Sequence, residues 1–189
     1  MRSLCMLVLL FLVSGLIYAQ DKTLLEVKKG VVLTYQVSVN GQQFPIQMKV
    51  DSISPDYTRF GWSMQDGNGG NVINTKPSLD NATHAYWGDL RAGEDQIMTA
   101  DQSILILSRS SWNALQKDKK FTLDDQEFTV KDQPADAIFK LKDKLVDVVF
   151  AQSANGAVRL WILNNPAAPI LVKIVGNPVG VDVNLTGVE

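Results

Sequence analysis

The chain has 189 residues, and its 18 lysines and arginines against 20 aspartates and glutamates give a net charge of −2. This length suits one domain with a substantial core, and the near-neutral charge without a basic stripe argues against nucleic-acid binding. The single cysteine, Cys5, and the single histidine, His84, exclude zinc sites built from several cysteines or histidines.

The first 19 residues have the pattern of a cleaved export signal. A basic residue near the start precedes an apolar run over 4–13, and Ala19 supplies a small residue for cleavage. The run is shorter than the roughly 20 residues that span a bilayer, so we expect no transmembrane segment in the mature chain. We predict a signal peptide at 1–19 and a single β-rich domain at 20–189. Because Cys5 leaves with the signal, the exported chain has no disulfide, which favours the periplasm or exterior of a Gram-negative bacterium.

The dipeptide Asn40-Gly41 separates two segments of alternating apolar residues and is typical of a two-residue hairpin turn. The register that this turn imposes places apolar pairs on one face of the ribbon: Val37 with Phe44, Tyr35 with Ile46, and Leu33 with Met48. The other face is polar, as in a sheet that covers a core on one side only. Pro45 has no amide hydrogen, so we expect its nitrogen to face an edge or a bulge.

The middle of the chain contains further short elements. We predict a strand over 57–65, a turn-rich break over 66–71 within a long connection over 66–102, and an apolar strand over 104–107. Ser110 or Ser111 caps a short helix over 112–119 that buries Trp112, Leu115 and Gln116. Another hairpin joins strands over 121–123 and 127–130.

A second Asn-Gly dipeptide, Asn155-Gly156, predicts a hairpin that is apolar on both faces. Its register pairs Phe150 with Trp161 and Val148 with Leu163 on one face, and Ala151 with Leu160 and Val149 with Ile162 on the other. Such a ribbon must be covered on both sides.

Two closing strands over 170–175 and 179–185 complete about nine or ten strands with one short helix. We therefore predict a mostly β fold, a single antiparallel barrel or a strongly curved half-barrel sheet, with a sandwich as the alternative.

One loop has the beginning of a calcium-binding pattern. Asp66 and Asn68 match the first and third positions of an EF-hand-like loop, but Gly70, Asn71 and Pro77 occupy the fifth, sixth and twelfth. The loop therefore lacks the required glycine and glutamate. We predict a turn and no metal site.

His84 and nearby carboxylates allow a hydrolase reading. A lone histidine can act as a general base, and Asp89, Glu94 and Asp95 can form an acid and nucleophile pair beside Tyr86 and Trp87. However, the sequence has no Gly-x-Ser-x-Gly elbow, and paired carboxylates are common on solvated loops. We predict no catalytic residue and no cofactor, and keep a secreted hydrolase using His84 as an alternative.

Six aromatic residues are candidates for lining a ligand cavity or its mouth. In a half-barrel, inward-facing aromatics hold lipids or other hydrophobic compounds, whereas in a packed barrel they are core. Long connections often act as binding loops, which favours the two aromatics in 66–102. The candidates are Tyr35, Trp62, Tyr86, Trp87, Trp112 and Trp161.

Several stretches already described resemble a group of exported envelope proteins, the domain of unknown function 3108 and its relatives. They cover residues 32–37, 108–115, 160–165 and 169–173. The resemblance implies a curved antiparallel barrel with a short helix, and it implies no catalytic residues. In shape the chain is also similar to lipoprotein-carrier folds, which hold acyl chains inside a half-barrel.

These features together favour an exported, non-enzymatic β-barrel-like domain that binds a hydrophobic or amphipathic ligand, such as a small molecule or lipid, or an envelope protein. One alternative is an interaction or scaffold module of the cell envelope, in which another chain covers the doubly apolar second hairpin.

Overall fold

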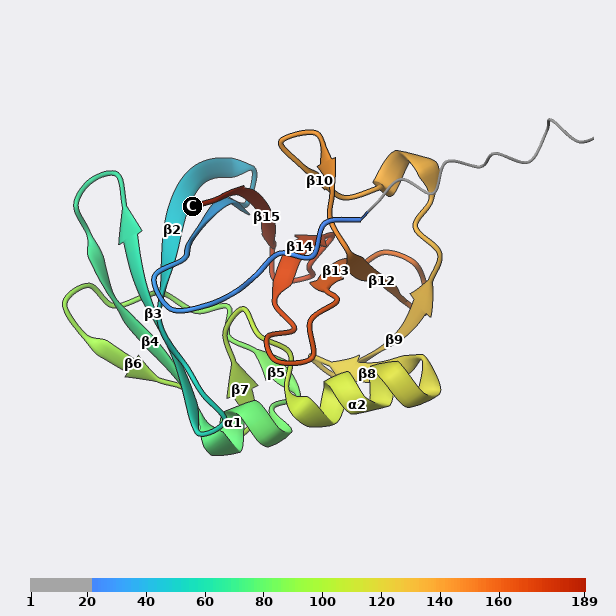
Figure 1. The fold of residues 1–189 in the computed structure, drawn as a ribbon, viewed down its shortest axis with the longest axis horizontal. Coiled ribbons are helices and arrows are strands. Elements are labelled where there is room, and N and C mark those ends of the chain that lie inside the picture. The colour runs from blue at the N-terminus through green and yellow to red at the C-terminus, as the bar shows by residue number, and fades with distance from the viewer. Residues whose placement is uncertain (1–21) are drawn as a thin grey trace, which may run out of the picture.

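The computed structural model describes residues 22–189, so the predicted signal peptide at 1–19 lies outside the described residues. Within this range the chain forms fifteen strands and two α-helices (Figure 1). The strands are β1 (Val32–Val39), β2 (Gln42–Ile53), β3 (Tyr57–Met64), β4 (Gly69–Thr75), β5 (His84–Ala85), β6 (Asp95–Ile97), β7 (Gln102–Ser103), β8 (Lys120–Leu123), β9 (Gln126–Lys131), β10 (Lys140–Leu141), β11 (Lys144–Leu145), β12 (Val148–Ser153), β13 (Arg159–Leu163), β14 (Leu171–Val175) and β15 (Val181–Val188). The helices are α1 (Lys76–Asn81) and α2 (Arg109–Asp118), with a 3₁₀ turn at Ala135–Ala137.

Eleven strands form one sheet in the order β6-β4-β3-β2-β1-β15-β14-β13-β12-β9-β8. The prediction of a mostly β fold is confirmed. Closure into a barrel is not observed in the described part of the chain, because β6 and β8 stand at the two ends of this order. The expected all-antiparallel pairing is wrong for two strand pairs: β5 runs parallel to β7 in a separate two-stranded sheet, and β6 runs parallel to β4 in the large sheet. The chain between them makes a crossover through α1, which brings it back in the same direction.

The first hairpin has the predicted register. Tyr35 pairs with Ile46 and Val37 with Phe44, and Asn40 and Gly41 both have the positive φ that a type I′ turn requires. Pro45 lies just beyond the pairing of β2 with β3, which begins at Ile46. Its missing amide hydrogen therefore leaves no gap in the β2–β3 ladder, as expected.

The second hairpin is also confirmed, with Phe150 opposite Trp161 and Ala151 opposite Leu160. These four residues are buried although they lie on two faces. Residues around the 3₁₀ turn cover the Trp161 face, since the indole Nε1 donates a hydrogen bond of 2.8 Å to the Ala137 carbonyl. The required cover therefore comes from the chain itself.

The connection over 66–102 differs from its prediction. It contains β4, α1, β5 and β6, and β4 already begins at Gly69 inside the expected break. Helix α1 was not expected because six residues carry too little apolar periodicity, although Thr75 caps it by accepting from the Ser78 amide. The strand expected over 104–107 is reduced to a single bridge at Ile106, because Leu105 has a φ of +61° that interrupts an extended chain.

The single predicted helix is α2, and α1 makes a second one. Ser108, rather than Ser110 or Ser111, caps α2 by accepting from the Ser111 amide. Trp112 and Leu115 are buried as predicted, whereas Gln116 is exposed.

The two halves of the large sheet separate between β14 and β15, which pair at two positions only, Lys173 with Asn184 and Ile174 with Val183. Backbone groups of Leu171 find other partners here. Its carbonyl accepts a hydrogen bond of 3.1 Å from the Tyr35 hydroxyl, and its amide donates to the Leu105 carbonyl at 2.7 Å. The Tyr35 side chain and the loop at Leu105 therefore supply the hydrogen bonds that Leu171 does not make to a neighbouring strand here.

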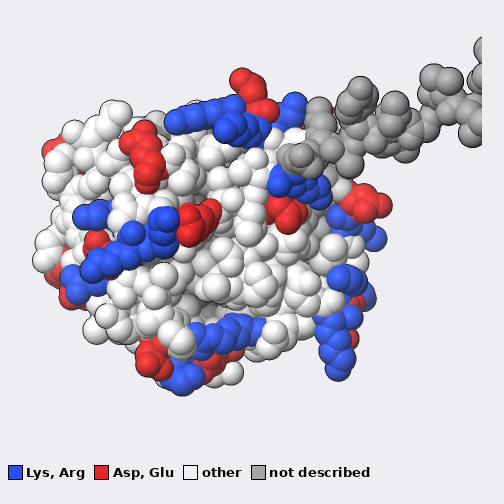
Figure 2. Space-filling view, in the orientation of Figure 1, with Lys and Arg blue, Asp and Glu red and all other residues white. Residues whose placement is uncertain are grey.

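On the face shown in Figure 2, basic and acidic side chains are interspersed around wide uncharged areas, without a basic stripe. Among residues 22–189, no helix has both the length and the apolar character needed to cross a bilayer.

The hydrogen bond of Tyr35 to Leu171, where the two halves of the large sheet separate, can be tested through the pH dependence of stability. Burial raises the pKa of its phenol well above the ordinary value of 10.0, so the unfolded chain ionises first as the pH rises. The free energy of unfolding should then fall above about pH 10, by up to about 1.4 kcal/mol per pH unit. Tyr35→Phe should remove this contribution and, by leaving the Leu171 carbonyl without its donor, cost about 1–3 kcal/mol at neutral pH.

Urea titrations of both proteins from pH 7 to 11 measure the two effects. The two proteins differ only in the phenolic hydroxyl of residue 35, so the difference between their two curves is the informative quantity. If the free energy of unfolding depended on pH in the same way in both proteins, the raised pKa of Tyr35 would be contradicted.

Candidate functional site

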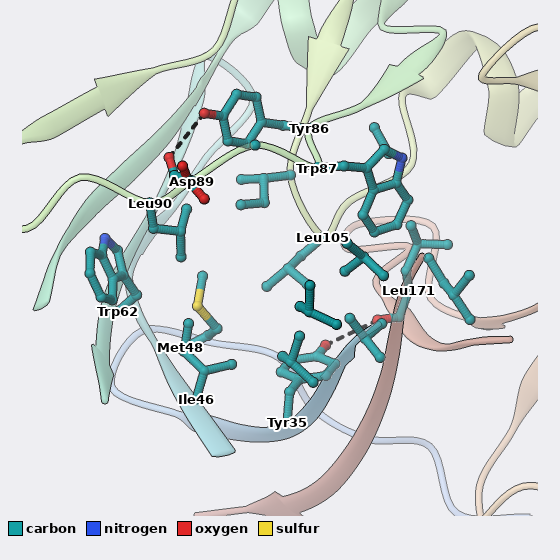
Figure 3. Close-up of a pocket in the computed structure, with 18 of the residues that line it drawn as sticks. Tyr35, Ile46, Met48, Trp62, Tyr86, Trp87, Asp89, Leu90, Leu105 and Leu171 are labelled. Carbon is teal, nitrogen blue, oxygen red and sulfur yellow. Dashed lines mark hydrogen bonds between the residues drawn. The ribbon is translucent and has the colours of Figure 1, made fainter. Parts of the chain in front are cut away.

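A cavity of about 440 Å³ opens on one face of the curved sheet. The inward-facing residues of five neighbouring strands form its wall: Tyr35, Val37 and Val39 of β1, Phe44, Ile46 and Met48 of β2, Trp62 and Met64 of β3, Leu171 and Ile174 of β14, and Val181 and Val183 of β15. The segment 85–90, together with Ile104 and Leu105, closes the opposite side. Figure 3 shows Tyr35, Met48 and Leu105 converging on this space.

The alternation of the strands explains the composition of this wall. In β1 the cavity-facing residues alternate with Gln36 and Ser38, so the period of two puts only apolar side chains inside. Burial decreases along the strands. Tyr35 and Met48 are 1% and 2% exposed, whereas Val37 and Val39 nearer the hairpin tip are half-buried. The cavity therefore has a floor at Tyr35 and a mouth near the strand ends.

Asp124 fixes one end of the segment that covers the cavity. Its two carboxylate oxygens accept hydrogen bonds of 2.8 Å, one from the Ala85 amide and one from the Trp87 indole Nε1. The Asp124 amide donates to the Thr83 carbonyl at 2.9 Å. Asp124 lies in the β8–β9 turn with a φ of +50°, a conformation that aspartate accepts more readily than most residues. This carboxylate holds the Trp87 ring at the side of the mouth.

A second set of contacts shapes the other end of this segment. The Tyr86 hydroxyl donates to the Asp89 carbonyl at 3.0 Å and thereby folds its ring over Gly88. A Cβ at position 88 would lie 2.6 Å from the Tyr86 hydroxyl oxygen, so only glycine permits this approach. Gln96 of β6 also donates to the Asp89 carbonyl, at 3.4 Å.

Trp62 is buried in the wall, and the absence of a side chain on its cross-strand partner, Gly70, makes room for it. A Cβ at Gly70 would lie 3.0 Å from the Trp62 Nε1 and 2.7 Å from the Arg91 carbonyl. Among the described residues the Trp62 Nε1 has no hydrogen-bond partner. Gly70 therefore lets both the Trp62 indole and the Arg91 carbonyl approach the backbone of β4 closely.

Leu105 is the strained residue of the cavity. It is half-buried and lines the space with a φ of +61°, which is unusual for a bulky side chain. Its carbonyl accepts from the Leu171 amide, so the surrounding structure holds it there. Strained backbone of this kind is often found where a protein contacts a ligand.

The candidate catalytic groups do not come together at this cavity. The His84 side chain is 37% exposed, with its Nε2 3.6 Å from an Asp125 carboxylate oxygen and its Nδ1 3.2 Å from the Thr83 hydroxyl. Asp95 pairs with Arg59 at 3.0 Å, and Glu94 lies 3.7 Å from Arg91. The described residues contain no group of three or more His, Cys, Asp or Glu that could hold a metal ion.

Four of the six predicted aromatics, Tyr35, Trp62, Tyr86 and Trp87, line the cavity. Trp112 and Trp161 do not. Trp112 is a buried residue of α2. Trp161 lies on the other face of the sheet, since its neighbour Leu160 pairs with the cavity-lining Ile174, and it packs against Phe150 at a ring-centroid distance of 4.9 Å.

Sequence reasoning missed three features of the site: Leu105, Leu90 and the anchoring role of Asp124. The inward positions of Ile46 and Met48 were available from the first hairpin register. No local pattern links Asp124 to a segment almost forty residues earlier.

No protein-family model, no curated protein and no solved structure matches this chain.

Asp124→Ala should loosen the segment over the cavity. The change removes two charge-assisted hydrogen bonds, which we expect to lower the free energy of unfolding by about 2–4 kcal/mol. Amide hydrogen exchange over residues 83–90 should become faster. Asp125→Ala is the matched control, because Asp125 shares the same turn and a positive φ of 59° but is 92% exposed. Equal effects of the two substitutions would show that backbone strain, not anchoring, explains the loss.

Leu105 offers a test of strain that compares two truncations. Leu105→Gly and Leu105→Ala remove the same contacts beyond Cβ, but only glycine adopts a positive φ without penalty. The glycine variant should be more stable by about 1 kcal/mol, measured by urea denaturation. Leu107 is the control, because it is buried and does not have a positive φ. At this position the alanine variant should be more stable than the glycine variant. The same order at both positions would contradict strain at Leu105.

Proposed function

We propose that this chain is an exported, non-enzymatic binding protein that holds a hydrophobic or amphipathic ligand in the cavity, its sheet acting as a half-barrel. The observation that carries this proposal is the apolar cavity of about 440 Å³ on the curved sheet. This volume lies within the range of about 300–1,000 Å³ that is usual for small-molecule sites. The four aromatics on its wall add large apolar surfaces for contact.

The polar groups of the cavity support binding of an apolar group. Three of the four side-chain donors on the cavity wall, the Tyr35 hydroxyl, the Tyr86 hydroxyl and the Trp87 indole, donate to partners within the protein. The fourth, the Trp62 Nε1, lies beside Gly70 and has no partner among the described residues. A hydrocarbon group entering the cavity therefore breaks none of these hydrogen bonds. Each square ångström of apolar surface that leaves water contributes about 25 cal/mol.

The arrangement of the candidate catalytic residues favours a binding role over hydrolysis. The His84 ring contacts the exposed Asp125 and is not among the cavity-lining residues, while Glu94 and Asp95 pair with arginines elsewhere. The scaffold alternative has no support of its own, because residues of the same chain cover both faces of the second hairpin.

Export is part of the proposal and is supported by the signal pattern at 1–19. A protein that shields an apolar ligand from water would serve transport or storage in the periplasm of a Gram-negative bacterium or outside it. The resemblance of several sequence stretches to exported envelope proteins would fit this role.

The first experiment is mass spectrometry of the protein purified from its native source without detergent. A co-purifying lipid or other apolar compound in stoichiometric amount would support the proposal. Protein that is free of ligand and also fails to bind the neutral hydrophobic probe N-phenyl-1-naphthylamine would overturn it.

Filling the cavity should weaken binding of this probe. Val37→Trp places a large ring inside, and we expect the affinity to fall about tenfold or more, measured by fluorescence titration. Ser38→Trp is the matched control, because it introduces the same ring one residue away on the outer face of β1. Thermal unfolding establishes that both variants fold. Equal loss of affinity in both variants would contradict a site in this cavity.

A further inference from the structure

The residues that line the cavity carry charge of one sign only. Among the described residues that line it, Asp89 is the single charged one, and none is a lysine, an arginine or a histidine. Asp89 is exposed, so it belongs to the mouth and not to the floor. The polar end of a bound amphiphile would lie at this mouth while its apolar part occupies the interior.

The position of Asp89 is fixed through its backbone. Its carbonyl accepts hydrogen bonds from the Tyr86 hydroxyl and from Gln96, at 3.0 and 3.4 Å. These contacts leave the carboxylate free, and within residues 22–189 no lysine, arginine or histidine forms an ion pair with it. Figure 3 shows Asp89 between Tyr86 and Leu90. A ligand cation can therefore approach a carboxylate that has no competing partner.

The interior offers no cation to a negative charge. The donor of the wall without a partner among the described residues, the Trp62 Nε1, is neutral and lies beside Gly70. The Tyr35 hydroxyl at the floor already donates to the Leu171 carbonyl, and burial raises the pKa of this phenol, so it stays neutral. A carboxylate that entered the cavity would lose its hydration without gaining a cation. At the mouth it would meet the like charge of Asp89.

We infer that the cavity selects single-chain amphiphiles whose polar end is a cationic amine, with neutral ends bound less tightly and anionic ends least. The inference rests on the proposed function, because it requires the apolar chain to occupy the cavity. The chain would lie on the floor formed by Tyr35 and Met48, and the ammonium would pair with the Asp89 carboxylate.

Three ligands with the same chain test this order: decylamine, decanol and decanoate. Each is titrated at pH 7 and low salt against the protein loaded with N-phenyl-1-naphthylamine, below the concentration at which it forms micelles. We expect displacement in the order decylamine, decanol, decanoate, with decanoate about tenfold weaker than decylamine. The preference for the amine should shrink as salt is added, because exposed charges are screened.

Asp89→Asn connects the order to this residue. It keeps the backbone carbonyl that Tyr86 and Gln96 contact but removes the charge, and we expect decylamine affinity to fall about threefold, to the level of decanol. Asp56→Asn makes the same change in net charge beyond the far end of β2, away from the hairpin tip, and should leave decylamine binding unaltered.

The outcomes separate the two proposals. If no ligand displaces the probe, the proposed function fails. If all three displace it equally, or if decanoate is the strongest, the cavity binds apolar chains but the inferred selectivity is wrong. An equal loss of decylamine affinity in Asp89→Asn and Asp56→Asn would also overturn the role of Asp89.

Discussion

The strands β14 and β15 diverge inside the molecule, so the backbone groups freed there need partners in an apolar environment. Tyr35 satisfies the Leu171 carbonyl, and the Leu105 carbonyl satisfies the Leu171 amide. These two contacts let the sheet open without leaving buried polar groups unpaired. The floor of the cavity and the path of the segment behind it both depend on this arrangement. Leu105, whose carbonyl makes one of these two contacts, has a left-handed backbone conformation.

Much of the sheet could be predicted because its strongest signals are local. Each Asn-Gly dipeptide sets a turn, the turn sets a register, and the alternation of apolar residues then agrees with that register over several pairs. The parts that could not be predicted depend on distant partners. Strand β6 is defined by its pairing with β4 at the edge of the sheet. Helix α1 is too short to show apolar periodicity. The break at Leu105 follows from the hydrogen bond between its carbonyl and the Leu171 amide of β14. Whether a curved sheet closes is likewise a property of the whole chain.

The candidate site shows the same division. The alternation of apolar and polar residues in β1 placed Tyr35 on an apolar face. The length of the connection over 66–102 drew attention to its two aromatic residues. For Trp161, parity correctly separated it from Leu160, but nothing local indicates which of two apolar faces borders a cavity and which the 3₁₀ segment covers. Asp124 illustrates the remaining difficulty. An aspartate in a hairpin turn is ordinary, and only the folded chain brings its carboxylate to Trp87.

The pairing of β1 with β15 has a consequence for the order in which the molecule is built. Tyr35 and Leu171 are separated by 136 residues, and β1 obtains its second neighbour only from the last strand of the chain. Contacts of such long sequence separation require the closure of a large loop before they repay it, so they form late and slowly. The nascent chain can complete its local hairpins early, yet the cavity lacks the part of its wall that β14 and β15 supply until the final residues arrive. A chain shortened at its C-terminus would therefore lose the cavity while it could still form its local hairpins.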